Sequence, residues 1–119
     1  MKPSSELLAY FKDHEDQIQA FAQILATRGI ERGLIGPKEG DRIWERHIAN
    51  SIPVTTLIPQ GVRVVDIGSG AGLPGIVIAL ARPDLKMTLV EPLQRRVDFL
   101  IEVVCLLYTS DAADEEDSV

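Results

Sequence analysis

Apolar residues recur at helical spacing along the first quarter of the chain. Between residues 4 and 28 they fall three, four and seven positions apart, which predicts helix with Ser4 or Ser5 as its N-terminal cap. The polar run at 13–16 can divide this stretch into two helices. Residues 29–41 hold four glycines and one proline, and we expect a loop there.

A further helix is predicted to begin near Arg42, with Asp41 as its cap. Its predicted buried side carries five residues: Ile43, Trp44, His47, Ile48 and Ser51. Pro53 either bends this helix or starts a new one, and the apolar pattern continues to Ile58. Residues 1–58 are therefore expected to form an N-terminal helical region.

The periodicity changes after residues 59–61. Residues 62–67 are mostly β-branched and end at Gly68, which predicts a buried strand. Residues 85–90 predict a second strand that ends at Glu91. The segment between them predicts a helix over 76–81, with Pro74 in its first turn.

One more helix is expected over 93–104. Four charged residues are expected to face outward from it: Arg95, Arg96, Asp98 and Glu102. Strand, glycine loop, helix, strand and helix together form a βαβα unit, which implies a parallel sheet. The fold class is therefore α/β.

Composition narrows the function classes only slightly. The net charge of −6 comes mainly from residues 105–119, which hold five acids and no base and whose removal leaves 13 acids against 12 bases. One cysteine excludes an internal disulfide, and two isolated histidines do not suggest a metal site. With no apolar run long enough for a bilayer, we expect no membrane association and a cytoplasmic location.

The chemistry is concentrated in residues 64–75, which read VVDIGSGAGLPG. Ligands of open parallel sheets bind outside the carboxyl ends of the strands, where this loop and Glu91 would share one crevice. Closely spaced glycines let a ligand approach the main chain. A carboxylate 21 residues after Gly70 can accept hydrogen bonds from both ribose hydroxyls, so the pattern indicates an adenosine-type nucleotide.

Two classes of cofactor suit this layout. Residues 70–75 match G-x-G-x-x-G, the dinucleotide pattern. Asp66, Gly68 and Gly70 match D-x-G-x-G, in which the acid suits the cationic methionine part of S-adenosylmethionine, and Pro74 lacks a backbone donor for a phosphate. This chemistry favours S-adenosylmethionine. The structural alternatives are a tight turn for the glycines, a helix cap for Asp66 and an ordinary strand-end acid for Glu91.

Two longer segments carry a family resemblance: WERHIANSI at 44–52, and VVDIGSGAGLPGIVIALARPDLKMTLVEPLQRRVDFL at 64–100. Together they resemble the bacterial ribosomal RNA small subunit methyltransferase G family, formerly called glucose-inhibited division protein B. The resemblance covers roughly residues 15–104. It implies N-terminal helices followed by the first βαβα of a Rossmann-like, class I S-adenosylmethionine-dependent methyltransferase fold.

The same resemblance implies a function. It is transfer of a methyl group from S-adenosylmethionine to N7 of a guanine in 16S rRNA of the small ribosomal subunit, by a monomeric enzyme. The cofactor-binding residues that it implies are Asp66, Gly68, Gly70, Gly72, Leu73 and Glu91. Gly68 and Leu73 would contact the cofactor, and Glu91 would hold the ribose. Arg46 and His47 would order the helix behind the loop; no catalytic side chain is assigned.

The chain departs from the family pattern after Val104. Family members are longer, and residues 105–119 resemble a translated sequencing adapter. We therefore expect residues 59–104 to be the start of a truncated methyltransferase domain, 105–119 to be a non-native tail, and the chain alone to be poorly folded and inactive. Two alternatives stay open: a non-catalytic nucleotide- or RNA-binding fragment, and an NAD-dependent oxidoreductase fragment.

Overall fold

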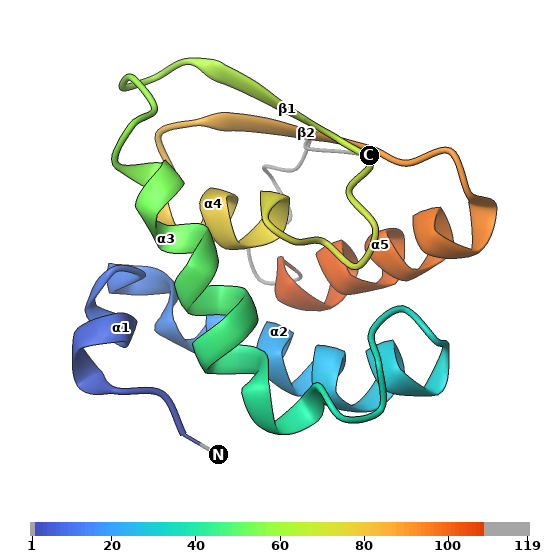
Figure 1. Ribbon diagram of the computed structural model, residues 1–119. Helices are drawn as coiled ribbons and strands as arrows, with labels where there is room; N and C mark the ends of the chain where they lie inside the picture. Colours follow the sequence, from blue (N-terminus) through green and yellow to red (C-terminus); the bar gives the residue numbers. More distant parts are fainter. Residues whose placement is uncertain (1, 109–119) are drawn as a thin grey trace.

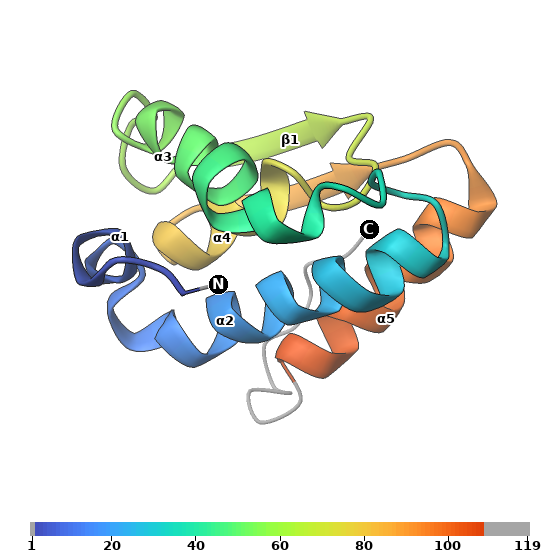
Figure 2. The ribbon, with the colours of Figure 1, turned by 60° about the horizontal axis from the view of Figure 1, so that its bottom comes forward.

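A computed structural model describes residues 2–108 and shows an α/β arrangement with two strands (Figure 1). The strands form the upper layer of Figure 1, and the helices lie below them. Turning the molecule keeps this arrangement, with α2 and α5 running side by side beneath the sheet (Figure 2). The described residues thus have the predicted α/β class, with a small sheet of two strands.

The N-terminal segment contains α1 (Ser5–Ala9), η1 (Lys12–His14), α2 (Glu15–Ile24) and the π-helical η2 (Leu25–Gly29). Ser4 is the predicted cap: its Oγ accepts a hydrogen bond of 3.1 Å from the Leu7 amide. The predicted division into two helices is also confirmed. It falls slightly earlier than the polar run, because the chain already turns at Lys12, where φ is 43°.

The second helical segment follows the predicted loop. It consists of η3 (Gly40–Arg42), the π-helical η4 (Ile43–Ile48) and α3 (Ala49–Thr55). The prediction that Asp41 caps this helix is wrong: Asp41 lies inside η3, and η4 has no side-chain cap. Pro53 lies within α3. The five residues predicted for the inner side are buried or half-buried.

The sheet confirms the predicted order and direction of the strands. β1 (Arg63–Ile67) and β2 (Lys86–Val90) are parallel neighbours, with Ile67 opposite Val90. They are connected through α4 (Gly75–Ala81), and α5 (Gln94–Leu107) follows β2. The carboxyl ends of both strands therefore lie at one edge.

Among residues 2–108, helices cover only one face of this sheet. Met87 and Leu89 of β2 face the helices and are buried, whereas Val65, Ile67 and Val90 are 56%, 80% and 43% exposed. The prediction of a buried first strand is thus wrong for one of its faces. A strand that is apolar on both sides needs a layer on each side to be buried, and the described helices supply one layer.

The core lies between the covered face and the helices. Apolar side chains from α2, η2, η4, α4 and α5 fill it, since these helices place residues three and four positions apart toward the sheet. Its fully buried members include Ile18, Phe21, Leu25, Ile43, Ile48, Val77, Leu80, Phe99, Leu100 and Val103. This core fixes the helices against the β-α-β unit.

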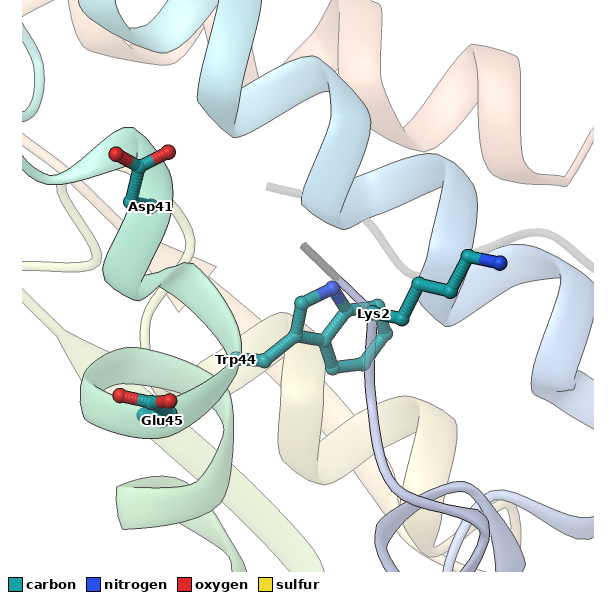
Figure 3. Close-up of a pocket in the computed structure, with 4 residues that line it drawn as sticks. All are labelled: Lys2, Asp41, Trp44 and Glu45. Atoms are coloured by element: carbon teal, nitrogen blue, oxygen red, sulfur yellow. The ribbon is translucent and has the colours of Figure 1, made fainter.

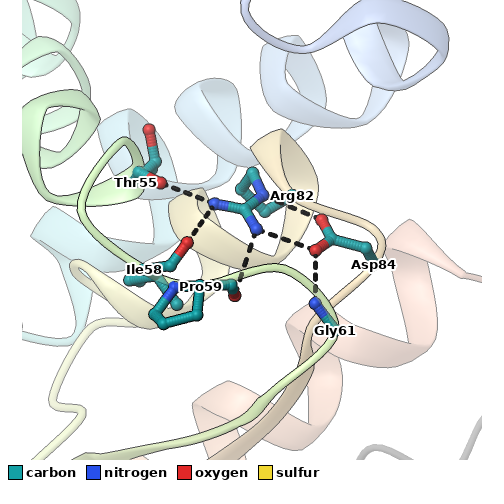
Figure 4. Close-up of polar contacts among 6 residues, drawn as sticks. All are labelled: Thr55, Ile58, Pro59, Gly61, Arg82 and Asp84. Atoms are coloured by element: carbon teal, nitrogen blue, oxygen red, sulfur yellow. Dashed lines mark hydrogen bonds and ion pairs between the residues drawn. The ribbon is translucent and has the colours of Figure 1, made fainter.

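Arg82 joins the helical region to the β-α-β unit (Figure 4). Its guanidinium donates to the carbonyls of Thr55, Ile58 and Pro59 at 2.7, 3.0 and 3.3 Å. It also forms two hydrogen bonds of 2.8 Å with Asp84. These bonds satisfy carbonyls at the C-terminal end of α3, where a helix leaves acceptors unpaired.

The last described helix extends beyond the predicted boundary at Val104. α5 continues to Leu107, whose side chain is buried. Residues 109–119 lie outside the described residues, so the interpretation of 105–119 as a non-native tail stays a prediction. Within residues 2–108, none of the helices is long and apolar enough to cross a membrane.

Candidate cofactor site

The glycine loop is attached to the end of the neighbouring strand. The amides of Gly68 and Ser69 both donate to the carbonyl of Val90, at 2.7 and 3.1 Å. The chain after β1 therefore turns across the end of β2. The loop therefore lies beside Glu91, as expected for two parallel neighbouring strands.

The loop turns through three glycines in the left-handed region. Gly68, Gly70 and Gly72 have φ values of +79°, +55° and +94°, a conformation that costs other residues free energy. A Cβ on Gly68 would meet no atom within 4 Å, whereas one on Gly72 would lie 2.6 Å from Ile76 and 3.3 Å from Phe21. Gly72 is thus needed for packing, and Gly68 borders open space.

Asp66 is turned toward the helices. Its Oδ2 accepts a hydrogen bond of 3.1 Å from the amide of Gly75, the first residue of α4. A Cβ on Gly75 would lie 2.5 Å from that oxygen, so the strand and helix meet without space between them. Burial raises the pKa of Asp66, and the negative charge of Glu91 adds to the rise, against the hydrogen bonds from Gly75 and Ser69.

The pKa of Glu91 is shifted in the opposite direction. Its Oε1 accepts a hydrogen bond of 2.7 Å from the Gly70 amide, and its Oε2 accepts one of 3.1 Å from the Leu93 amide. The hydrogen bond from Leu93 lowers the pKa of Glu91 most, and the bond from Gly70 and the charge of Arg96 lower it further. An ionised carboxylate accepts about four hydrogen bonds, so each oxygen keeps a lone pair for a ligand hydroxyl.

The structure brings three of the six predicted binding residues together at the edge that the loop and β2 form: Gly68, Gly70 and Glu91. Gly72 is buried behind this edge. Leu73 is half-buried against the core, next to a cis Leu73–Pro74 bond. The Asp66 carboxylate lies on the helix side and acts on the loop through α4.

The two motif residues expected to order the helix behind the loop are placed differently. Arg46 is exposed, and the Nε2 atom of His47 lies 2.7 Å from Glu39, in the segment before η4. Neither side chain bonds to the loop among residues 2–108. The side chains beside Gly72 of the loop are Ile76 of α4 and Phe21 of α2.

The expectation that Arg96 faces outward from α5 is wrong. Arg96 is half-buried, while Arg95 is exposed and donates to the Arg32 carbonyl at 3.0 Å. The signal was available: position 96 precedes the buried Phe99 and Leu100 by three and four residues, so it lies on their face of the helix.

A separate pocket lies between the N-terminal segment and η4 (Figure 3). Lys2, Asp41, Trp44 and Glu45 line it, and Trp44 reaches toward the segment that carries Lys2. It contains none of the glycine-loop residues and neither Asp66 nor Glu91. In the described part of the chain, no group of three or more His, Cys, Asp or Glu is arranged to hold a metal ion.

Comparison with known proteins identifies the family of this chain. Residues 14–113 match the family model for rRNA small subunit methyltransferase G. The chain belongs to this family. The resemblance expected from the motifs is thereby confirmed.

Individual members of the rRNA small subunit methyltransferase G family are closely similar. The protein of that name from Mycobacterium sp. (strain JLS) is 59% identical over 102 residues, which are 86% of this chain and 44% of that protein. The one from Corynebacterium jeikeium (strain K411) is 66% identical over 83 residues, 70% of this chain and 37% of that protein. The chain thus spans less than half the length of these curated relatives.

Proposed function

We propose that this chain forms the cofactor-binding part of an S-adenosylmethionine-dependent enzyme that methylates N7 of a guanine in 16S rRNA. The fold would be the first part of a Rossmann-like, class I methyltransferase domain. The proposal includes a monomeric protein in the cytoplasm, where ribosomal RNA is found. It is supported by the family, by the edge that carries Gly68 and Glu91, and by the hydrogen bond between the Asp66 carboxylate and the Gly75 amide.

The position of Asp66 is the observation that carries the choice of cofactor. In a dinucleotide site, the pyrophosphate binds at the N-terminus of the helix after the glycine loop, where amides are free. Here the amide of Gly75, the first residue of α4, already donates to the Asp66 carboxylate. Pro74 has no amide to donate. An anion would therefore face a carboxylate, which disfavours NAD and suits a cofactor without phosphate.

The described residues fit such a cofactor. Glu91 offers one lone pair on each oxygen to the two ribose hydroxyls, with Gly70 and Leu93 holding the carboxylate in place. Gly68 leaves open space beside the main chain for the ligand. Leu73 supplies apolar surface at the end of the loop. S-adenosylmethionine would supply an electrophilic methyl group.

The proposed methyl acceptor requires little acid–base chemistry from the chain. N7 of guanine carries an in-plane lone pair, so no residue has to remove a proton before transfer. Catalysis can then depend on alignment of the two reactants and on electrostatics. This agrees with a site in which Asp66 and Glu91 are both engaged by backbone amides rather than free to exchange protons.

Calorimetry with S-adenosylhomocysteine and NAD tests the choice of cofactor. We expect a longer protein that contains this chain, of the length of its relatives, to bind S-adenosylhomocysteine and to bind NAD at least tenfold more weakly. Tighter binding of NAD would overturn the proposal in favour of an oxidoreductase. Methyl transfer to 30S particles distinguishes an enzyme from a binding fragment: the longer protein should label a guanine at N7, and binding without any transfer would indicate a non-catalytic role.

A further inference from the structure

The exposed face of the sheet carries an ordered pattern of charge. Alternate residues of the two strands lie on it, and all of them are exposed: Arg63, Val65 and Ile67 of β1, and Lys86, Thr88 and Val90 of β2. We call these six residues the outer face. The register places Arg63 opposite Lys86 and Ile67 opposite Val90, so two cations lie at the amino end and apolar side chains at the carboxyl end.

The two cations of the outer face have no counter-charge within residues 2–108. Neither Arg63 nor Lys86 belongs to any of the ion pairs there. Asp84, which precedes β2, is bound by Arg82 and by the Gly61 amide. Like charges at directly opposite strand positions are unfavourable, so a negative group placed over this pair would stabilise the sheet.

The carboxyl half of the outer face is apolar. Val65, Ile67 and Val90 are 56%, 80% and 43% exposed, and their burial would be favourable. Parallel sheets are covered on both faces, usually by the helices that connect their strands. This chain matches less than half of each relative, so a protein of their length has further segments for such a layer.

We propose that an amphipathic helix covers the outer face in a longer protein that contains this chain, with an apolar stripe on Ile67 and its neighbours and an acidic residue between Arg63 and Lys86. From Arg63 to Ile67, β1 rises about 13 Å, the length of about nine residues of helix. The acidic residue and the apolar contact over Ile67 are therefore about two and a half turns apart in a helix that lies along the strands. The proposal does not depend on the cofactor or on the reaction.

Matched threonine variants test the apolar contact. Ile67 and Leu57 are 80% and 79% exposed, and Leu57 lies outside the outer face. In the longer protein, Ile67→Thr should lower the melting temperature by about 5 °C, through loss of one buried aliphatic side chain. Leu57→Thr should leave it unchanged. An unchanged melting temperature for Ile67→Thr would overturn the proposal.

Charge reversal tests the acidic residue. In the longer protein, Arg63→Glu combined with Lys86→Glu should lower the melting temperature by about 5 °C, because two attractions become repulsions. Lys38→Glu, at an exposed position outside the sheet, should have no such effect, and Arg63→Lys should be tolerated. An unchanged or raised melting temperature for the double reversal would overturn the acidic residue over this pair.

Thiol labelling of the longer protein does not depend on stability. Thr88→Cys, in the middle of the outer face, should react about tenfold more slowly in the folded protein than in urea, whereas Leu57→Cys should differ little. Equal rates for Thr88→Cys in the two states would overturn the proposal. Sedimentation identifies the other occupant: a dimer that Ile67→Thr dissociates would assign the outer face to a second copy of the protein and overturn the proposal as well.

Discussion

Two glycines with almost the same geometry allow the open side of the loop to be tested. Gly68 has φ +79° and Gly61 has φ +73°, and a Cβ on either would meet no atom within 4 Å. Gly68 lies at the carboxyl end of β1, where we propose the cofactor binds. Gly61 lies before the start of β1, at the opposite end of the strand. Substitution of each by alanine separates conformational strain from loss of ligand space.

The expected stability cost is the same for both variants. An L-residue in the left-handed region costs about 1–2 kcal/mol, and neither new methyl group meets a neighbour. For a domain of roughly this size, each kcal/mol lowers the melting temperature by roughly 4 °C. Gly68→Ala and Gly61→Ala should therefore melt several degrees below the unsubstituted chain and within a few degrees of each other.

Ligand binding should differ between them. The methyl group of Gly68→Ala occupies space that the ligand needs, so its affinity for S-adenosylhomocysteine should fall at least tenfold by calorimetry, well below the melting temperatures. Gly61→Ala should bind like the unsubstituted chain. Equal affinities in the two variants would refute the inference that the ligand approaches the main chain at Gly68.

Three further substitutions probe the packing and charge around the site. Gly75→Ala should destabilise the chain by about 1–3 kcal/mol in urea unfolding, because its Cβ would overlap the Asp66 carboxylate. Asp66 has a raised pKa, so the folded state holds its proton more tightly than the unfolded chain; stability should fall as pH rises above the ordinary value of 3.8, and Asp66→Asn should remove that slope. Arg82→Gln should lower the melting temperature through loss of its bonds to the end of α3, whereas Arg63→Gln, at an exposed position of β1, should not.

Each of these expectations has a contrary result. Undiminished stability of Gly75→Ala would mean that α4 can move away from β1. A stability profile of Asp66→Asn that still falls above pH 3.8 would assign the slope to another group. Equal melting temperatures for Arg82→Gln and Arg63→Gln would show that water replaces the Arg82 bonds at the end of α3 without cost.

The order of elements and the closeness of the glycine loop to Glu91 could be predicted from the sequence, because both depend on local signals. The change from helical spacing to a β-branched run at Val62 marks the first strand, and Ser4 marks the first helix. Parallel strands bring the residues after them to one edge, so the closeness of Gly70 and Glu91, joined at 2.7 Å, follows from the βαβ order.

The directions of individual side chains could not be predicted in the same way. The covered face of β1 depends on which helices pack on it, and nothing in the alternation of Val64 and Val65 shows that only one side is covered. The charge of Arg96 suggested an exposed position, although its spacing from Phe99 indicated the core. At Asp66, the strand pattern gives the face but not the partner, the Gly75 amide at 3.1 Å.

The two acids beside the glycine loop have different surroundings, although the sequence pattern assigned cofactor binding to both. Asp66 is turned to the helix side, has a raised pKa because of burial, and binds the first amide of α4. Glu91 has a lowered pKa because two amides bind it, and it keeps lone pairs at the open edge.

Asp66→Asn can keep an acceptor for the Gly75 amide. It should therefore alter the pH dependence of stability more than the affinity for the ligand. Glu91→Gln replaces one acceptor oxygen by an amino group that cannot accept the Gly70 or Leu93 amide, so it should weaken diol binding first. If Asp66→Asn instead weakened S-adenosylhomocysteine binding as much as Glu91→Gln, the aspartate would have to contact the ligand itself.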